Sequence, residues 1–86
     1  MNKIAKFIKD LEGFTGSAKL WKVIPPLEKN DYVITSATYA MFSGPETYIF
    51  GAYKNGKVKD WTELTGSYEG DEDHQQAIKN AGYSAE

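Results

Sequence analysis

The dipeptide Asn55-Gly56 constrains the fold more strongly than any other feature of this sequence. It lies between residues 48–54 and 57–61, two runs that carry aromatic and β-branched side chains. Asn-Gly is the favoured pair for a type I′ turn, in which both central residues need a positive φ. The sequence therefore predicts a β-hairpin with a two-residue turn at this point.

This turn also predicts the register of the hairpin. Counting outward from the turn, Lys54 faces Lys57, and Phe50 faces Trp61 four pairs further on. Aromatic residues that face each other across two strands stabilise a sheet. We expect both rings to be buried on the core face, so that Trp61→Ala costs about 3 to 5 kcal/mol.

A second hairpin is predicted just before the first. Residues 32–42 are rich in β-branched and aromatic residues, and residues 43–46, with the sequence Ser-Gly-Pro-Glu, form a loop to the next strand. A four-residue loop pairs Phe42 with Thr47. That pairing places Tyr39 on the same core face as Phe50.

The N-terminal segment has the spacing of an amphipathic helix. Its apolar residues recur at positions i, i+3, i+4 and i+7, while lysines occupy most of the other positions. Gly13 follows this pattern, where a left-handed residue commonly ends a helix. The apolar positions are Ile4, Phe7, Ile8 and Leu11.

A second helix is predicted near the other end of the chain. Asp71 or Asp73 can cap its first turn, and the pattern continues to about Ala81. Gly82 then stands at the position where a left-handed residue ends a helix. In that motif the residue after the glycine folds back onto the last helical turn.

The length and composition limit the fold and its chemistry. Eighty-six residues suffice for one domain, residues 1–86, with one core. The absence of cysteine and the presence of one histidine exclude disulfides, thiol nucleophiles and cysteine- or histidine-rich metal sites. We expect no metal, no cofactor and an α+β fold, a small antiparallel β-meander of three to four strands flanked by an N-terminal and a C-terminal helix.

The charge is small in total and uneven along the chain. Residues 1–43 carry six lysines and four acids, a balance of +2, whereas residues 44–86 carry four lysines and eight acids, a balance of −4. Arginine, whose fork reads guanine and phosphate, is absent, which disfavours nucleic acid as a partner. The uneven charge suits an oriented encounter with a charged partner protein.

The sequence indicates a cytoplasmic protein. Its runs without charge are much shorter than the roughly 20 apolar residues that cross a membrane. Lys3, Lys6 and Lys9 are scattered among apolar residues, unlike the separate basic region of a signal peptide. We expect no membrane contact, and the oligomeric state stays open.

Four carboxylates at the start of the second predicted helix form the first candidate partner-binding site: Glu69, Asp71, Glu72 and Asp73. The helix dipole favours negative charge there, and only one or two of the four can cap the helix. Their spacing lacks the alternating ligands of a calcium-binding loop. We expect the others to meet a basic partner, and replacement of Glu72 and Asp73 by lysine to slow association.

Lys54, Lys57 and Lys59 form an alternative surface around the Asn55-Gly56 turn. With Phe50 and Trp61 on the same predicted face, they could hold single-stranded nucleic acid, because bases stack on aromatic rings. The competing interpretation is structural. The rings are then buried, and the lysines keep the end of the hairpin from aggregating.

His74 is the one side chain with an ordinary pKa near neutrality. As a general base in a small hydrolase-like enzyme it would have to meet a carboxylate of Asp60, Glu63 or Glu46. It also lies on the apolar stripe of the second predicted helix. The competing interpretation is therefore a half-buried packing histidine with a local hydrogen bond.

Several short motifs stand out along the chain: Phe14-Thr15-Gly16, Pro25-Pro26-Leu27, the run from Ser43 to Phe50, Asp60-Trp61 and Gly82-Tyr83. Together they resemble those of a group of small uncharacterised proteins carried by phages and bacterial genomes. The resemblance covers most of the chain after Lys9. It implies a phage or mobile element as the setting and a protein that binds and blocks a host component, such as a defence nuclease.

The favoured function is a non-enzymatic protein-binding module that acts by occlusion. It would use the acidic surface or an edge strand, for which residues 19–24 are the candidate. Pro25-Pro26 is expected to stop that strand, because proline has no N–H to donate. The alternatives are the hydrolase-like enzyme with His74 and the nucleic-acid-binding hairpin.

Overall fold

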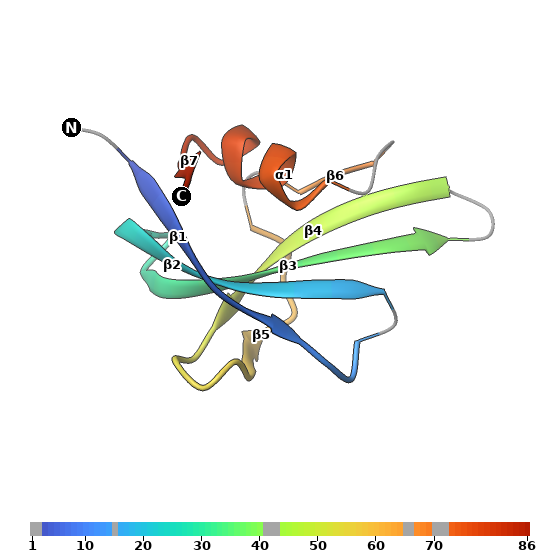
Figure 1. The fold of residues 1–86 in the computed structure, drawn as a ribbon, viewed down its shortest axis with the longest axis horizontal. Helices are drawn as coiled ribbons and strands as arrows, with labels where there is room; N and C mark the ends of the chain where they lie inside the picture. The colour runs from blue at the N-terminus through green and yellow to red at the C-terminus, as the bar shows by residue number, and fades with distance from the viewer. Residues whose placement is uncertain (1–2, 15, 41–43, 65–66, 70–72) are drawn as a thin grey trace.

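A computed structural model describes residues 3–14, 16–40, 44–64, 67–69 and 73–86. These residues form one curled, half-barrel sheet with the strand order β5-β4-β3-β2-β1-β7, in which β6 also pairs with β4 (Figure 1). A single short helix is present in this part of the chain. The elements are β1 (Ile4–Leu11), β2 (Ser17–Leu27), β3 (Asn30–Ala40), β4 (Gly44–Ala52), β5 (Val58–Asp60), β6 (Tyr68–Glu69), α1 (His74–Asn80) and β7 (Ser84–Ala85).

The predicted α+β meander between two helices is wrong, because the N-terminal segment is the strand β1. It pairs antiparallel with β2 and parallel with β7, and its register shifts between Phe7 and Lys9. This bulge changes which side chains face which side of the sheet. Ala5 belongs to one buried cluster, and Leu11 packs against the other. The apolar residues at helix-like intervals are therefore not one buried stripe, because Phe7 and Ile8 are exposed.

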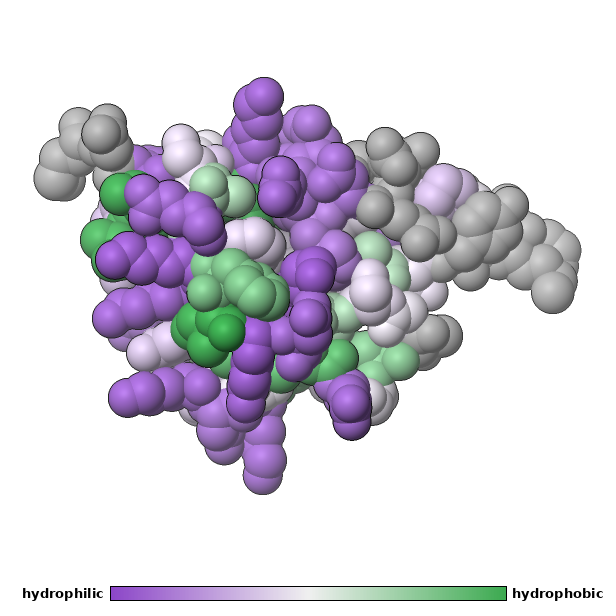
Figure 2. Space-filling view, in the orientation of Figure 1, coloured by the Kyte–Doolittle hydropathy of each residue, from purple (hydrophilic) through white to green (hydrophobic). Residues whose placement is uncertain are grey.

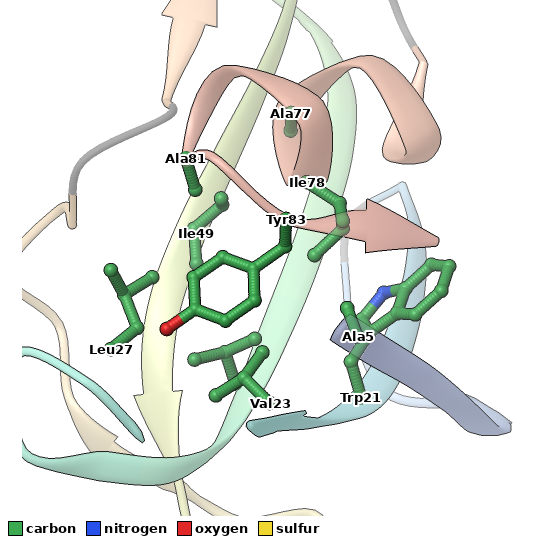
Figure 3. Packing of buried hydrophobic residues seen from close by; sticks show 10 residues of the cluster. Ala5, Trp21, Val23, Leu27, Ile49, Ala77, Ile78, Ala81 and Tyr83 are labelled. Atoms are coloured by element: carbon green, nitrogen blue, oxygen red, sulfur yellow. The ribbon is translucent and has the colours of Figure 1, made fainter. Parts of the chain in front are cut away.

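The sheet carries buried side chains on both of its faces. The helix face is the one that α1 covers, and its cluster consists of Ala5, Trp21, Val23, Leu27, Val33, Ile49, Ala77, Ile78, Ala81 and Tyr83. Figure 3 shows the Tyr83 ring reaching from the end of α1 into this cluster. The hairpin face is the opposite one, where Ala18, Leu20, Ile34 and Ala52 are buried, with Leu11, Phe14, Tyr32 and Val58 packed against them.

The β4–β5 turn closes over the hairpin face. A Cβ atom added to Gly56 would lie 2.8 Å from Cδ2 of Leu11, so the tip of this turn touches β1. In the order β5-β4-β3-β2-β1-β7, three strands separate β5, which follows this turn, from β1. Their contact follows the curl of the half-barrel sheet.

The hairpin of β3 and β4 is present, but its predicted register is wrong. Thr38 pairs with Glu46, and β4 begins at Gly44 inside the expected loop. The pairing is displaced by five residues, and an odd displacement turns side chains to the other face. Phe50 therefore pairs with Ile34 rather than with Tyr39. Met41, Phe42 and Ser43 lie outside the described residues.

Strand β2 is longer than expected and lies inside the sheet. It continues through Pro25-Pro26 to Leu27, and it pairs with β1 on one side and with β3 on the other. Its pairing with β3 is interrupted between Lys22 and Leu27, the stretch that contains both prolines. Proline is thus tolerated where no ladder bond is needed. Residues 19–24 are not an edge strand, and the edge-binding prediction for them is wrong.

The turn at Asn55-Gly56 is not the predicted type I′ turn. The Gly56 amide donates to the Tyr53 carbonyl, so the turn runs from Tyr53 to Gly56 with Lys54 and Asn55 at its centre. Among these four residues, Gly56 alone has a positive φ, +90°. A turn followed by a left-handed glycine is the bulged three-residue form of hairpin connection. Further along, the predicted pairing of Gly51 with Asp60 is present.

The predicted C-terminal helix is confirmed, and it starts at the later of the two proposed caps. Asp73 is the N-cap, and its carboxylate accepts the amide hydrogens of Gln75 and Gln76. Gly82 has a φ of +95°, and the Tyr83 amide donates to the Ile78 carbonyl. These are the bonds of the glycine-ended helix motif. The helix thereby delivers Tyr83 to the core.

The outer edge of β4 is bonded along most of its length. It pairs in turn with β5, with the segment around Leu64 and with β6. Ser67 Oγ accepts the Ile49 amide hydrogen in the gap between the two short strands. No helix among the described residues has the length and apolar content needed to cross a membrane.

Candidate binding surfaces

Trp61 is the most exposed of the large apolar side chains in the described part of the chain. Its ring lies 5.3 Å from the Phe50 ring in an edge-to-face contact, so the predicted adjacency is confirmed. Phe50 is 8% exposed, whereas Trp61 is 68% exposed, so the predicted burial of Trp61 is wrong. The reason is that β5 ends at Asp60, and the following chain passes round the edge of β4 to place Leu64 on the helix face.

Trp61 is part of a row of aromatic rings on the hairpin face. The Phe14 ring lies 6.3 Å from it on one side, and Phe50 leads to Tyr48, also at 6.3 Å, on the other. Tyr48 Oη donates a hydrogen bond of 2.6 Å to Glu46. We call these four side chains, Phe14, Trp61, Phe50 and Tyr48, the aromatic row. The exposed Trp61 ring thus packs against the Phe14 and Phe50 rings.

The lysines of the alternative surface do not all accompany the aromatic row. Lys54, Lys57 and Lys59 are exposed at the end of the hairpin. The Lys59 ammonium lies 5.9 Å from the centre of the Tyr53 ring, and both residues line a hollow of about 510 Å³. Leu64, which packs on the helix face, lines the same hollow. Lys59 therefore belongs to the other side of the β5 segment from Trp61.

The acidic candidate site is described only in part. Asp71 and Glu72 lie outside the described residues. The backbone of Glu69 pairs with Glu46 as part of β6, and its side chain is outside the described part. Asp73 is exposed and caps α1, as expected for one member of the group.

His74 stands in a chain of hydrogen bonds that joins α1 to β2 and β3. Its Nδ1 lies 2.7 Å from Thr35 Oγ1, and its Nε2 lies 2.7 Å from Ser17 Oγ. Thr35 Oγ1 also accepts the indole N–H of Trp21 at 2.8 Å. Both ring nitrogens thus bond to hydroxyl groups from distant strands, so the predicted local bond is wrong, and these bonds involve no carboxylate.

The surroundings of His74 keep its imidazole neutral. The side chain is 8% exposed, and this burial is the main cause that lowers its pKa. The positive charge of Lys19 lowers the pKa further. Hydrogen bonding to the Thr35 backbone and the charges of Asp73 and Asp10 act in the opposite direction and are smaller.

We expect the protein to lose stability as the pH falls below about 6.5, the ordinary pKa of histidine. A lowered pKa in the folded state means that the unfolded chain binds the proton more readily. The contribution of His74 is therefore complete above pH 6.5 and is lost as the pH falls toward the folded-state pKa. Urea titrations at pH 7.5 and 5.5 measure this change.

His74→Gln is the control for this pH effect. The chain has one histidine, so this variant should show a flatter dependence of the unfolding free energy over the same interval. An equally steep dependence in the variant would assign the effect to carboxylates instead.

A pocket of about 450 Å³ opens beside His74, between β1, α1 and β7. Phe7 and Trp21 form its aromatic wall, with their rings 5.6 Å apart in an edge-to-face contact. Lys19, Asp73 and Glu86 supply charged groups around it. None of the sequence patterns indicated this pocket, because the arrangement of β1, β2, α1 and β7 brings its residues together.

Comparison of the chain with protein-family models, with curated proteins and with solved structures finds no match. The resemblance to small phage and bacterial proteins therefore stays a prediction. The geometry of the described residues is what supports a function.

Proposed function

We propose that this chain is a non-enzymatic protein-binding module whose contact surface is the aromatic row, with Trp61 at its centre. The observation that carries the proposal is the 68% exposure of Trp61 on a base of packed rings. Tryptophan is enriched among the few residues that carry most of the binding energy of an interface. An indole that already rests on Phe14 and Phe50 loses little side-chain freedom when a partner covers it.

The charges beside Trp61 favour a basic partner surface. Glu63 is exposed two residues after Trp61, and the exposed Asp60, which precedes Trp61, lines the hollow of Lys59 and Tyr53. The backbone amide and hydroxyl of Thr62 bond to the Asp60 carboxylate and lower its pKa, which keeps it ionised. Glu46 lies at the Tyr48 end of the row. A lysine or arginine of the partner can then lie over the Trp61 ring, where its charge attracts the π system.

The two alternatives have less support. Phosphate groups would meet the carboxylates beside Trp61, while Lys59 lies over Tyr53 on the other side of β5. A hydrolase based on His74 lacks its carboxylate, because hydroxyl groups bond to both ring nitrogens. A binding module requires neither feature, and it can act by occluding the surface that it covers.

The test is the effect of Trp61→Ala on association with proteins of the cell that expresses the chain. We expect at least a roughly 30-fold loss of affinity, equivalent to the 2 kcal/mol of an interface hot spot. The melting temperature should stay within a few degrees of the wild type. Immunoprecipitation with quantitative mass spectrometry measures the loss, and thermal unfolding checks the fold.

Tyr53→Ala is the matched control. Tyr53 is 52% exposed on the same hairpin, but it is not part of the aromatic row. It should leave association almost unchanged. If Trp61→Ala retained every partner of the wild type, or if both variants lost the same partners, the aromatic row would not be the contact surface.

A further inference from the structure

Three lysines of β1 and β2 lie on the hairpin face of the sheet. Lys9 pairs with Leu20, which is buried in the cluster of that face. Lys22 pairs with Tyr32, which packs against the same cluster. Directly paired residues point to the same side of a sheet, so both lysines lie on the hairpin face. Lys6 joins them, because it pairs with Lys22 across β1 and β2.

The β4–β5 turn adds two lysines to this surface. A Cβ atom added to Gly56 would lie 3.7 Å from Cε of Lys9. The backbone of the turn therefore reaches Lys9, and the turn also carries Lys54 and Lys57. We call the five side chains the lysine face, and all of them are exposed: Lys6, Lys9, Lys22, Lys54 and Lys57.

The carboxylates of the neighbouring strands point away from the lysine face. Strands β1, β2 and β3 contain two, Asp10 and Asp31, and the turn residues 53–57 contain none. Asp10 follows Lys9, and Asp31 precedes Tyr32. Because side chains alternate along a strand, both carboxylates point to the helix face, where Asp10 forms an ion pair with Lys19. The lysine face therefore has a local excess of positive charge, although the whole chain carries −2.

Two isoleucines continue the lysine face toward the start of β1. Ile4 pairs with Ile24, two residues along the strands from the pair of Lys6 and Lys22. Side chains two residues apart lie on one face of a strand, so these isoleucines share the face of the lysines. Ile24 is 44% exposed. The surface thus combines point charges with an accessible apolar side chain.

We infer that the lysine face binds a membrane surface that contains anionic lipids, with the Ile24 side chain among the headgroups. Lysines are attracted to anionic lipids as point charges, so this contact does not require arginine, which the chain lacks. Apolar side chains enter the boundary between headgroups and acyl chains. A nucleic-acid backbone would leave Ile24 unused, because it presents phosphates and sugars. The helix α1, on the other face, stays in solution.

The sequence patterns did not indicate this surface. A helical N-terminal segment places Lys6 and Lys9 on its polar side, whereas the pairing of β1 with β2 brings them beside Lys22. The expectation of no membrane contact rested on the short uncharged runs and on the scattered N-terminal lysines. A contact at the membrane surface requires neither a spanning segment nor a signal peptide.

The lysine face is separate from the aromatic row. Phe50 and Tyr48 of the row belong to β4, and β3 separates that strand from β2. Trp61 contacts Phe50. Membrane binding therefore goes beyond the proposed function and does not depend on it.

The experiment is the flotation of the full chain with lipid vesicles. One preparation contains phosphatidylcholine alone, and the other adds roughly 30% phosphatidylserine, which makes the surface potential negative. We expect at least about ten-fold tighter binding to the anionic vesicles. Raising the salt from about 0.1 M to about 1 M should remove most of this binding, because the Debye length falls from about 10 Å to about 3 Å.

Four variants show which side chains make the contact. Lys6→Gln and Lys22→Gln should each weaken binding to anionic vesicles about five-fold, the usual contribution of one basic residue near such a surface. Ile24→Thr keeps the branch at Cβ and should weaken binding about three-fold, because less apolar area enters the lipid. Lys79→Gln is the matched control, since it removes the same charge from α1 on the other face. It should change binding less than about two-fold.

The melting temperature separates binding from folding. Lys6 and Lys22 face each other directly, and like charges in that position destabilise a sheet. Removing either charge should therefore keep or raise the melting temperature while vesicle binding falls. A fall in both quantities would assign these lysines a structural role and overturn the inference.

Four other results would also overturn the inference. The first is equal binding to neutral and anionic vesicles, and the second is an equal effect of Lys79→Gln and Lys22→Gln. The third is an affinity of Ile24→Thr equal to that of the wild type. The fourth is binding of a single-stranded oligonucleotide or of polyglutamate without binding of vesicles, which would replace the membrane by nucleic acid or by an acidic protein.

Trp61→Ala separates this inference from the proposed function. It should bind anionic vesicles as the wild type does while it loses its protein partners. Lys22→Gln should show the reverse. A failure of vesicle binding overturns this inference alone, whereas retention of every protein partner by Trp61→Ala overturns the proposed function alone.

Discussion

Replacing Trp21 with alanine should lower the free energy of unfolding by about 3 to 5 kcal/mol, the usual cost of truncating a buried aromatic residue. Trp21 is 3% exposed and packs in the cluster of the helix face. Its indole N–H donates to Thr35, which also bonds to His74. The variant therefore loses apolar contacts and takes a donor from a buried network, where an unmade bond is costly.

The second tryptophan is the matched control for this prediction. Trp61→Ala should cost about 1 kcal/mol or less, as is usual for an exposed position. Guanidinium titrations of both variants against the wild type give the comparison. If Trp61→Ala destabilised the protein as much as Trp21→Ala, Trp61 would be a core residue and its role at an interface would have to be abandoned.

Leu20→Ala should cost about 2 to 5 kcal/mol, although α1 does not cover this side chain. Leu20 is fully buried on the hairpin face, beneath the β4–β5 turn. Ile8→Ala is the control, because Ile8 lies at the bulge of β1 and is 43% exposed. Urea unfolding measures both. A cost below about 1 kcal/mol for Leu20→Ala would mean that the hairpin face is not a second core.

The elements that the sequence predicts well are those with local chemistry. The cap at Asp73 and the left-handed Gly82 are set by hydrogen bonds within a few residues, and both are found as expected. The contact of Phe50 with Trp61 also follows from a short hairpin. For these elements the sequence contains nearly all of the necessary information.

The N-terminal strand shows where such reasoning fails. Apolar spacing along a segment does not tell which of its side chains neighbouring strands will cover. In β1 the buried Ala5 lies outside the apolar pattern, while Phe7 and Ile8, which belong to it, are 44% and 43% exposed. The decisive interactions are with β2 and β7, which are remote in sequence.

The turns show a second limit. The two-residue connection with positive φ at both central positions occurs at Glu28 and Lys29, not at Asn55-Gly56. The Asn30 amide group donates to the carbonyls of Leu27 and Glu28, which supports this unusual backbone. Hydrogen bonds from the Asn30 side chain thus support a turn whose central residues are not the glycine or asparagine usual at positive φ.

The candidate sites likewise combine features that the local sequence predicts with features that depend on the tertiary arrangement. The sequence identified the cap, the hairpin lysines and His74, but the exposure of Trp61 depends on where β5 ends. The pocket depends on the alignment of β1, β2, α1 and β7. Figure 2 shows a mainly hydrophilic face on which hydrophobic side chains emerge between hydrophilic ones, and hydropathy along the sequence does not predict such places.

The most direct test of the proposed function is photo-crosslinking next to Trp61 in living cells. Benzoylphenylalanine at position 63 replaces an exposed carboxylate and leaves Trp61 in place. The same probe at position 53 samples the other side of the hairpin. We predict a discrete protein adduct from position 63, at least about ten-fold less of it when Trp61→Ala is added, and no such adduct from position 53. Identical adducts from both positions, an adduct that survives Trp61→Ala, or a nucleic-acid adduct alone would contradict the proposal.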